Sequence, residues 1–95
     1  MLEWLKSLPR EDRRTIGEDI KTAQYGWPLG MPLIRKMERG LWEVRSNVST
    51  GIARVIFTVQ GATMILLHGF VKKSRKTPLN DLDTARRRLN NLEKD

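Results

Sequence analysis

The stretch that decides the fold is Ile52–Val71, with the sequence IARVIFTVQGATMILLHGFV. Its two halves, Ile52–Gln60 and Thr63–Val71, are rich in β-branched and large apolar residues and are typical of buried strands. Only Gly61 and Ala62 separate them, and a two-residue connection that contains glycine is typical of a tight hairpin turn. The stretch therefore predicts an antiparallel β-hairpin.

A third strand is expected before this hairpin. Leu41–Ser46 alternates apolar and polar residues, and Asn47–Gly51 is a short polar connection to the next strand. The sheet is then predicted to be a meander of three antiparallel strands.

Helices are predicted on both sides of the strands in sequence. Leucines recur every three residues over Leu2–Leu8, and Pro9–Gln24 continues with an amphipathic pattern in which Ile16, Ile20 and Ala23 are the buried residues. Tyr25–Pro32 contains several glycines and prolines and is expected to be a loop. After Thr77-Pro78, a last helix carries an apolar stripe of Leu82, Ala85, Leu89 and Leu92. The predicted fold class is α+β, with N-terminal helices packed on a small antiparallel sheet and a C-terminal helix.

The chain is 95 residues long with a mass of 11.0 kDa, which is the size of a single domain spanning residues 1–95. It contains no cysteine, so disulfides, thiolate metal sites and cysteine nucleophiles are excluded. Its longest apolar run, Met64–Leu67, is too short to cross a membrane, and no signal-peptide pattern follows Met1. We expect a cytoplasmic protein with no membrane partner.

The charge is strongly basic: 18 Lys and Arg against 11 Asp and Glu give a net charge of +7, and the sequence pI is about 10.4. Residues 1–34 carry five basic and five acidic side chains, whereas residues 35–95 carry thirteen and six. The second part is therefore the candidate surface for a polyanion such as RNA. The alternative is a basic protein with no nucleic-acid partner.

Strand pairing gives a specific candidate site. Leu41–Arg45 can pair with the middle strand so that Arg45 lies opposite Arg54, and two opposed arginines repel each other. This register needs either a carboxylate between them, for which Glu43 is the candidate, or a bound anion such as an RNA phosphate. The alternative is that Arg45 simply pairs with Glu43 or lies on a solvated sheet edge.

The same register predicts which side chains share a face. A tight turn at Gly61-Ala62 pairs Gln60 with Thr63 and Phe57 with Leu66. One face then contains Val55, Phe57, Val59, Leu66, His68 and Phe70. The other contains Arg54, Ile56, Ile65 and Leu67, followed by Lys73. His68 is the obvious acid–base candidate by residue type, but this register makes it a core histidine, and a longer turn would reverse its face.

Four cations lie within Lys72–Lys76. Such a cluster attracts phosphate, although it is also typical of a solvated basic loop. RNA can be cut without a metal when its 2′-hydroxyl attacks the adjacent phosphate, and arginine can stabilise the negative charge that develops. Lysine can transfer a proton if neighbouring cations lower its pKa. One histidine and scattered carboxylates offer no metal-ligand cluster, so no cofactor is expected.

Several stretches resemble the phage-derived, HigB-like branch of the RelE toxin superfamily. They are Gly40–Arg45 (GLWEVR), Ala53–Val55, Leu66–Lys73 (LLHGFVKK), Lys76–Pro78, and a last helix with Ala85 and Arg88. The resemblance covers residues 2–92, and the His-Gly-Phe-x-Lys-Lys-x-x-Lys-Thr-Pro stretch is its most specific part.

That resemblance implies a curved antiparallel sheet flanked by helices and an mRNA interferase that cuts mRNA on the ribosome. It also implies a cognate antitoxin, commonly a helix-turn-helix protein. The catalytic residues that it implies are Arg54, Lys73, Lys72 and Arg45, with His68 as a possible acid or base. The expected RNA-binding residues are Lys76, Arg75, Arg35 and Lys36.

One departure from the family pattern bears on activity. Members usually begin with a strand before the first helix, and this chain begins almost at the helix, so that a sheet edge is expected to lie open. Two other functions are therefore kept as alternatives: a non-catalytic RNA- or ribosome-binding protein, as a decayed toxin would be, and a structural phage protein.

Overall fold

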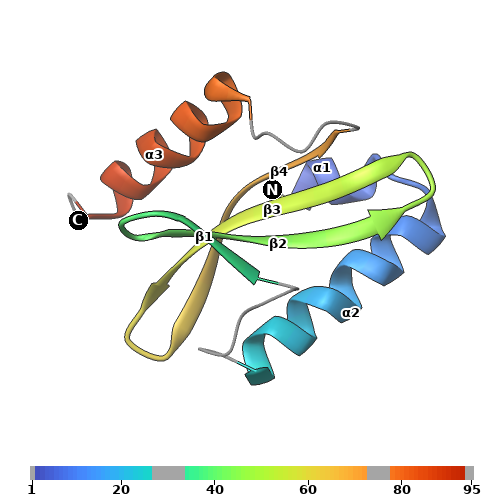
Figure 1. Cartoon of the computed structure of the whole chain (residues 1–95), viewed down its shortest axis with the longest axis horizontal. Coiled ribbons are helices and arrows are strands. Elements are labelled where there is room, and N and C mark those ends of the chain that lie inside the picture. The colour runs from blue at the N-terminus through green and yellow to red at the C-terminus, as the bar shows by residue number, and fades with distance from the viewer. Residues whose placement is uncertain (1, 27–33, 73–77, 94–95) are drawn as a thin grey trace.

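The computed structural model describes residues 2–26, 34–72 and 78–93, which form three helices and four strands (Figure 1). In chain order these are α1 (Leu2–Lys6), α2 (Arg10–Gly26), β1 (Ile34–Glu38), β2 (Leu41–Val48), β3 (Gly51–Gln60), β4 (Thr63–Lys72) and α3 (Leu79–Glu93). The predicted α+β class is confirmed.

The four strands form one antiparallel sheet in the order β1-β2-β3-β4. Gln60 pairs with Thr63 across the predicted tight turn, and Gly61 there has a φ of 60°, a left-handed conformation that glycine adopts without strain. Arg45 lies opposite Arg54, as the sequence predicts.

The prediction of three strands is wrong, because β1 adds a fourth beside β2. Its sequence, IRKME, lacks the apolar alternation that identifies a strand, and a bulge at Met37 interrupts its pairing. Short, charged and irregular strands are typical of sheet edges, where such features discourage pairing with another molecule. Among the described residues, β4 forms the other edge, and no strand precedes α1.

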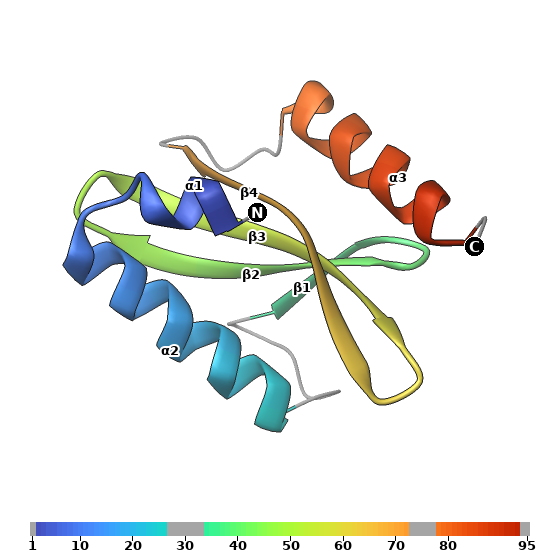
Figure 2. The ribbon, with the colours of Figure 1, turned by 180° about the vertical axis from the view of Figure 1, so that it is seen from behind.

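One face of the sheet, which we call the α2 face, packs against the two N-terminal helices (Figure 2). Its core is mainly apolar, with Asp12 of α2 and Ser46 of β2 the buried polar residues, and Ile16 and Ala23 of α2 are buried in it as predicted. The sheet contributes Ile34, Val44, Ala53, Val55 and Phe57 to this core.

The ring of Trp4 in α1 lies so close to Gly69 of β4 that a Cβ atom would have no room there. Glycine at this position therefore permits α1 to dock.

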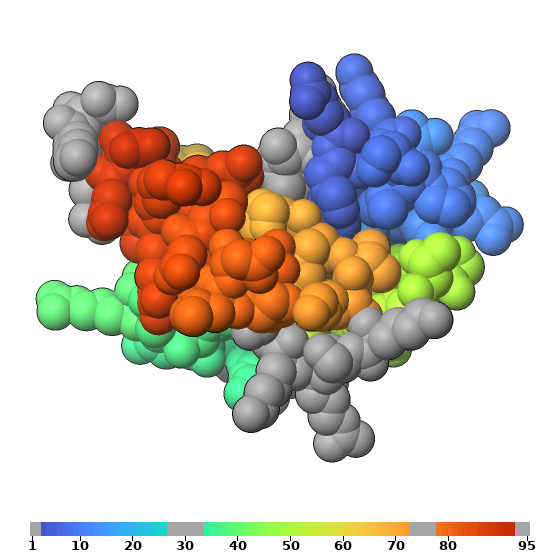
Figure 3. Space-filling model, turned by 90° about the horizontal axis from the view of Figure 1, so that it is seen from above, coloured from blue at the N-terminus to red at the C-terminus, as the bar shows by residue number. Residues whose placement is uncertain are grey.

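The opposite face, which we call the α3 face, packs against the C-terminal helix (Figure 1). Its buried apolar residues are Leu41, Ile56, Leu67, Phe70 and Ala85, and the predicted helical stripe of Leu82, Leu89 and Leu92 packs on them. In the space-filling view, α3 and β4 lie side by side on one surface, with the blue N-terminal helices on the far side of β4 (Figure 3).

The predicted register fails in the second half of β4. Phe57 pairs with Leu66, but Ile56 pairs with His68, so Leu67 is the extra residue of a β-bulge. An extra residue reverses the alternation of every side chain beyond it. His68 and Phe70 therefore lie on the α3 face with Arg54, and the prediction that they share a face with Phe57 is wrong.

The structure contains, in its described part, no helix that is long and apolar enough to span a membrane.

Candidate functional site

The α3 face carries a group of polar side chains next to the part that α3 covers. Because directly paired residues share a face, the pairing arranges these polar side chains, with the apolar residues between them, in three rows across the sheet. The rows are Arg35–Glu43–Ile56–His68, Arg45–Arg54–Phe70 and Asn47–Ile52–Lys72, each written from β1 or β2 towards β4.

Glu43 lies between two arginines and joins them into what we call the Arg–Glu–Arg cluster (Arg45, Glu43 and Arg54). Its Oε1 atom is 3.8 Å from Nε of Arg45 and 3.9 Å from a terminal nitrogen of Arg54. The sequence-based expectation of a carboxylate between the opposed arginines is confirmed. Two guanidinium groups share one carboxylate, so the cluster keeps a positive charge.

Burial sets the electrostatics of this cluster. Arg54 and Glu43 are fully buried, and burial lowers the pKa of Arg54, with Glu43 opposing this effect and Arg45 and Arg35 adding to it. Arginine remains protonated in proteins even when its pKa is lowered. The charges of Arg54 and Glu43 therefore lie where water is excluded and screening is weak, while Arg45 reaches the surface.

The two arginines differ in their access to solvent. The side chain of Arg45 is 30% exposed, whereas that of Arg54 is 0% exposed. An anion that approaches this face meets Arg45 first, with the charge of Arg54 beneath it. The structure thus brings Arg45 and Arg54 together, and gives only Arg45 direct access to a ligand.

Among the predicted basic residues, Lys72 joins this face. It is exposed and pairs with Ile52, two residues from Arg54 along β3. The register predicted from the sequence, which contains no bulge, places Lys73 on the same face as Arg54. Because the bulge shifts β4 by one residue, Lys72 is on that face instead. Lys73, Arg75 and Lys76 lie outside the described residues.

The two predicted RNA-binding residues that lie on β1 point to opposite faces of the sheet. Arg35 is exposed and lies directly opposite Glu43 in the pairing of β1 with β2. It therefore extends the positive charge of the cluster towards the sheet edge. Lys36 lies on the other face, where its Nζ is 5.9 Å from the ring centroid of Trp42. The structure therefore groups Arg35 with the cluster and separates Lys36 from it.

His68 makes a polar contact that the sequence did not reveal. Its Nε2 lies 2.7 Å from Oδ1 of Asp81, in the first turn of α3, and both side chains are 19% exposed. Its ring stacks on Phe70, with centroids 5.8 Å apart. The prediction that His68 is a core residue among apolar neighbours is wrong. Nothing in the local sequence pairs residues 68 and 81, because the helix brings them together only after the chain has folded.

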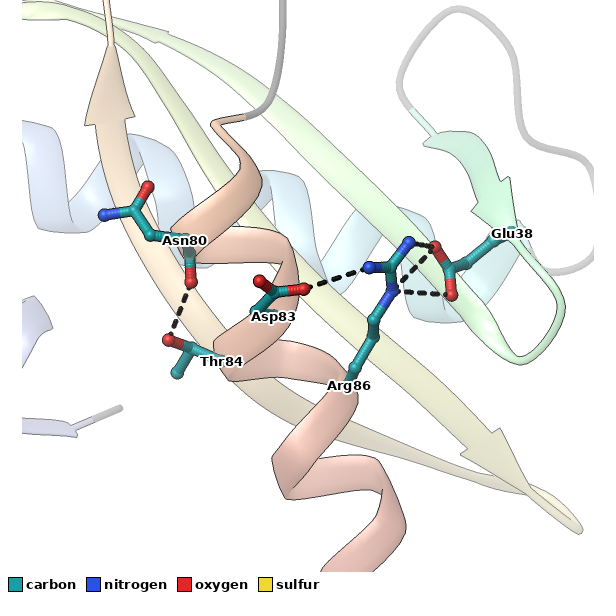
Figure 4. A network of polar contacts seen from close by, with 5 residues as sticks. All are labelled: Glu38, Asn80, Asp83, Thr84 and Arg86. Atoms are coloured by element: carbon teal, nitrogen blue, oxygen red, sulfur yellow. Dashed lines mark hydrogen bonds and ion pairs between the residues drawn. The ribbon is translucent and has the colours of Figure 1, made fainter.

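Further polar contacts fix α3 beside these rows (Figure 4). Arg86 donates hydrogen bonds of 2.7–3.1 Å to the carboxylate of Glu38 and one of 3.0 Å to Asp83. The hydrogen bond from Arg86, aided by its charge, lowers the pKa of Glu38, although partial burial opposes this effect. Arg88 donates a hydrogen bond to the carbonyl oxygen of Leu67 at the bulge. The bonds of Arg86 to Glu38 and of Arg88 to Leu67 hold the middle of α3 against β1 and β4, whereas the bond to Asp83 lies within the helix.

A family model described as "Phage derived protein Gp49-like (DUF891)" matches residues 3–90. The chain belongs to this Gp49-like family. The family is generally associated with RelE-like toxins. The match spans the sheet, both N-terminal helices and most of α3, so it includes every described residue of the three rows. No curated protein matches the chain.

In the described part of this Gp49-like chain, no three His, Cys, Asp or Glu side chains are grouped so that they could hold a metal ion. The chemistry that the α3 face offers through its own residues is anion binding at the Arg–Glu–Arg cluster and proton transfer at His68.

Proposed function

We propose that this Gp49-like protein is the toxin of a type II toxin–antitoxin system, acting as a metal-independent mRNA interferase of the RelE/HigB type. The observation that carries the proposal is the opposition of Arg45 and Arg54 around a single buried carboxylate. Two arginines that share one carboxylate are suited to receive a second anion, and the phosphodiester of RNA is one.

The reaction needs three things from the protein. A base must take the proton of the 2′-hydroxyl, a positive group must stabilise the phosphorane, and the leaving 5′-oxygen must gain a proton. Arginine suits the second role because its planar guanidinium binds two phosphate oxygens at once and keeps its charge. In this proposal Arg45 contacts the phosphate, and Arg54 supports it from beneath.

The surrounding cations hold the RNA. Arg35 and Lys72 lie at opposite ends of the rows and are both exposed, so they can contact phosphates on either side of the scissile one. Lys73, Arg75 and Lys76 follow Lys72 directly in sequence and are assigned the same role. The partners of the proposal are mRNA on the ribosome and a cognate antitoxin of the helix-turn-helix type. The family's association with RelE-like toxins supports the toxin role, and both partners are assigned as part of that proposal.

The test is induction of the protein in bacterial cells, with primer extension on a translated message with and without ribosomes. We expect growth arrest and new 5′ ends within the message. Arg45→Ala should restore growth and slow cleavage about 100–1,000-fold, because a group that stabilises the transition-state charge is lost. Lys36→Ala is the matched control, since it removes a cation from the other face and should leave cleavage unchanged. Intact messages after induction of the wild type would refute the proposal.

The burial of Arg54 favours a second candidate, which is binding of RNA or of the ribosome without cleavage. Phosphate binding needs only exposed cations, and Arg35, Arg45 and Lys72 supply them. Such a protein would bind RNA with an affinity that falls steeply with salt while the RNA stays intact.

A further inference from the structure

We propose that His68, oriented by Asp81, is the general base of the site. This inference rests on the proposed ribonuclease activity and assigns its proton-transfer step. The bulge at Leu67 makes it possible, because only an extra residue in β4 places His68 on the same face as the Arg–Glu–Arg cluster.

The position of His68 is suitable for a reaction centred on the cluster. Phe70 lies directly opposite Arg54, and His68 is two residues from Phe70 on the same strand and face. His68 is thus the diagonal neighbour of Arg54, and such neighbours lie about 7–8 Å apart. A phosphate contacted by Arg45 would lie above Arg54, on the face that His68 shares.

Two contacts hold the imidazole ring. Phe70 stacks against its face, and the carboxylate of Asp81 lies 2.7 Å from Nε2. An ionised carboxylate only accepts hydrogen bonds, so Nε2 must carry a proton, and the neutral ring then keeps its lone pair on Nδ1. This pairing gives the ring the tautomer of a base, as the carboxylate does in Ser-His-Asp enzymes. The partial exposure of the ring lets a substrate reach it.

The step balances without any added reagent. Nδ1 of His68 takes the proton of the 2′-hydroxyl, the 2′-oxygen forms a bond to phosphorus, and the bond from phosphorus to the 5′-oxygen breaks. The leaving 5′-oxygen takes a proton from water, and the hydroxide that remains takes the proton from the imidazolium. The products are a 2′,3′-cyclic phosphate and a 5′-hydroxyl end.

The test compares single-turnover cleavage of a ribosome-bound message by four proteins: the wild type, His68→Gln, Asp81→Asn and Asp83→Asn. His68→Gln keeps a donor for Asp81 but cannot accept the proton, so its rate should fall about 100–10,000-fold while its thermal unfolding stays near that of the wild type. Asp81→Asn leaves His68 in place but replaces the carboxylate by an amide whose NH2 group can donate to Nε2, so the tautomer is no longer fixed and we expect a loss of about 100-fold or more. Asp83→Asn makes the same change on an exposed residue of the same helix and should cleave like the wild type.

The pH dependence of the rate separates a base from a structural contact. The charged groups on the elements next to His68 are Asp81 and Arg88 of α3, Arg54 of β3 and Glu43 of β2, which lies in the same row; Lys72 lies further along β4. We expect the wild-type rate to rise with pH, because only a deprotonated base can accept the proton of the 2′-hydroxyl, and this rise to be absent in His68→Gln. His68→Ala should regain activity when imidazole is added.

The outcomes distinguish the two proposals. If His68→Gln cleaves at the wild-type rate with the same pH dependence, His68 only fixes α3 to the sheet, and this inference fails while the ribonuclease stands. Failure of added imidazole to restore any cleavage by folded His68→Ala also counts against it. If the wild type leaves RNA intact in a reaction that a known interferase completes, both proposals fail.

Discussion

The two faces of the sheet are built from different chemistry although they share the same strands. The α2 face buries only apolar side chains from the sheet, apart from Ser46, and two helices cover it. The α3 face buries apolar side chains under α3 but also two charged ones, Arg54 and Glu43, with no exposed surface. The comparison indicates that one face provides stability and the other holds charges that a core built for stability would omit.

The physical reason lies in desolvation. Removing a charge from water costs several kcal/mol, and a buried ion pair often adds no net stability over apolar residues of the same size. Burial of apolar area on the α2 face has no such opposing effect. The presence of the Arg–Glu–Arg cluster therefore favours a functional role, and three sets of substitutions test this contrast between the faces.

The largest effect is expected on the α2 face. Phe57 is fully buried there and stacks on Trp42, with ring centroids 6.1 Å apart. Phe57→Ala should lower the free energy of unfolding by about 3–5 kcal/mol through lost burial and the cavity that remains. Urea denaturation measures this loss, and Gln60→Ala, at an exposed position of the same strand, should change stability little. If Phe57→Ala lowered the free energy of unfolding by less than the Glu43→Gln variant described next, the α2 face would not be the face that provides most of the stability.

A smaller loss is expected from Glu43→Gln on the α3 face. It leaves the charge of buried Arg54 without its carboxylate, and we expect about 2–3 kcal/mol of destabilisation. The double variant Glu43→Leu/Arg54→Met replaces both charges by apolar groups and should unfold at a denaturant concentration near that of the wild type, yet cleave RNA much more slowly, because Arg45 loses the charge beneath it. A double variant that is both stable and fully active would show that the buried charges have no functional role.

The smallest effect concerns the ion pair of Glu38 and Arg86 at the edge of the α3 face. Since Arg86 lowers the pKa of Glu38, the pair stabilises the fold above the ordinary pKa of the carboxyl, and this stabilisation is lost as the pH falls through the lowered value. Arg86→Met should thus be less stable than the wild type at about pH 7, and the difference should shrink towards about pH 3. Arg87→Met, which changes an exposed neighbour, should show no such convergence. A difference independent of pH would mean that packing, and not the ion pair, accounts for the effect.

Sequence patterns predicted the parts of this molecule whose structure depends mainly on residues close together in the chain. The helices, the hairpin turn at Gly61 and the opposition of Arg45 and Arg54 follow from periodicity and turn chemistry, and the structure confirms them. The strand β1 was missed because an edge strand needs no apolar alternation.

The parts that failed depend on contacts distant in sequence. The bulge at Leu67 has no signal in the strand itself, because LLHGF is compatible with either register. Leu67 is buried under α3, and Arg88 of that helix caps its carbonyl oxygen. A helix that follows the strand in sequence therefore stabilises the register, and with it the placement of His68.

The bulge also determines what a change of register would do to this segment. Deleting Leu67 would remove the bulge but leave His68 opposite Ile56, because Leu67 is the residue without a partner across the strands. Pairing Leu67 with Ile56 instead would turn the imidazole towards the N-terminal helices and bring an apolar side chain beside the arginines. The register of this segment, more than the identity of its apolar residues, thus sets which face of the sheet carries the ring.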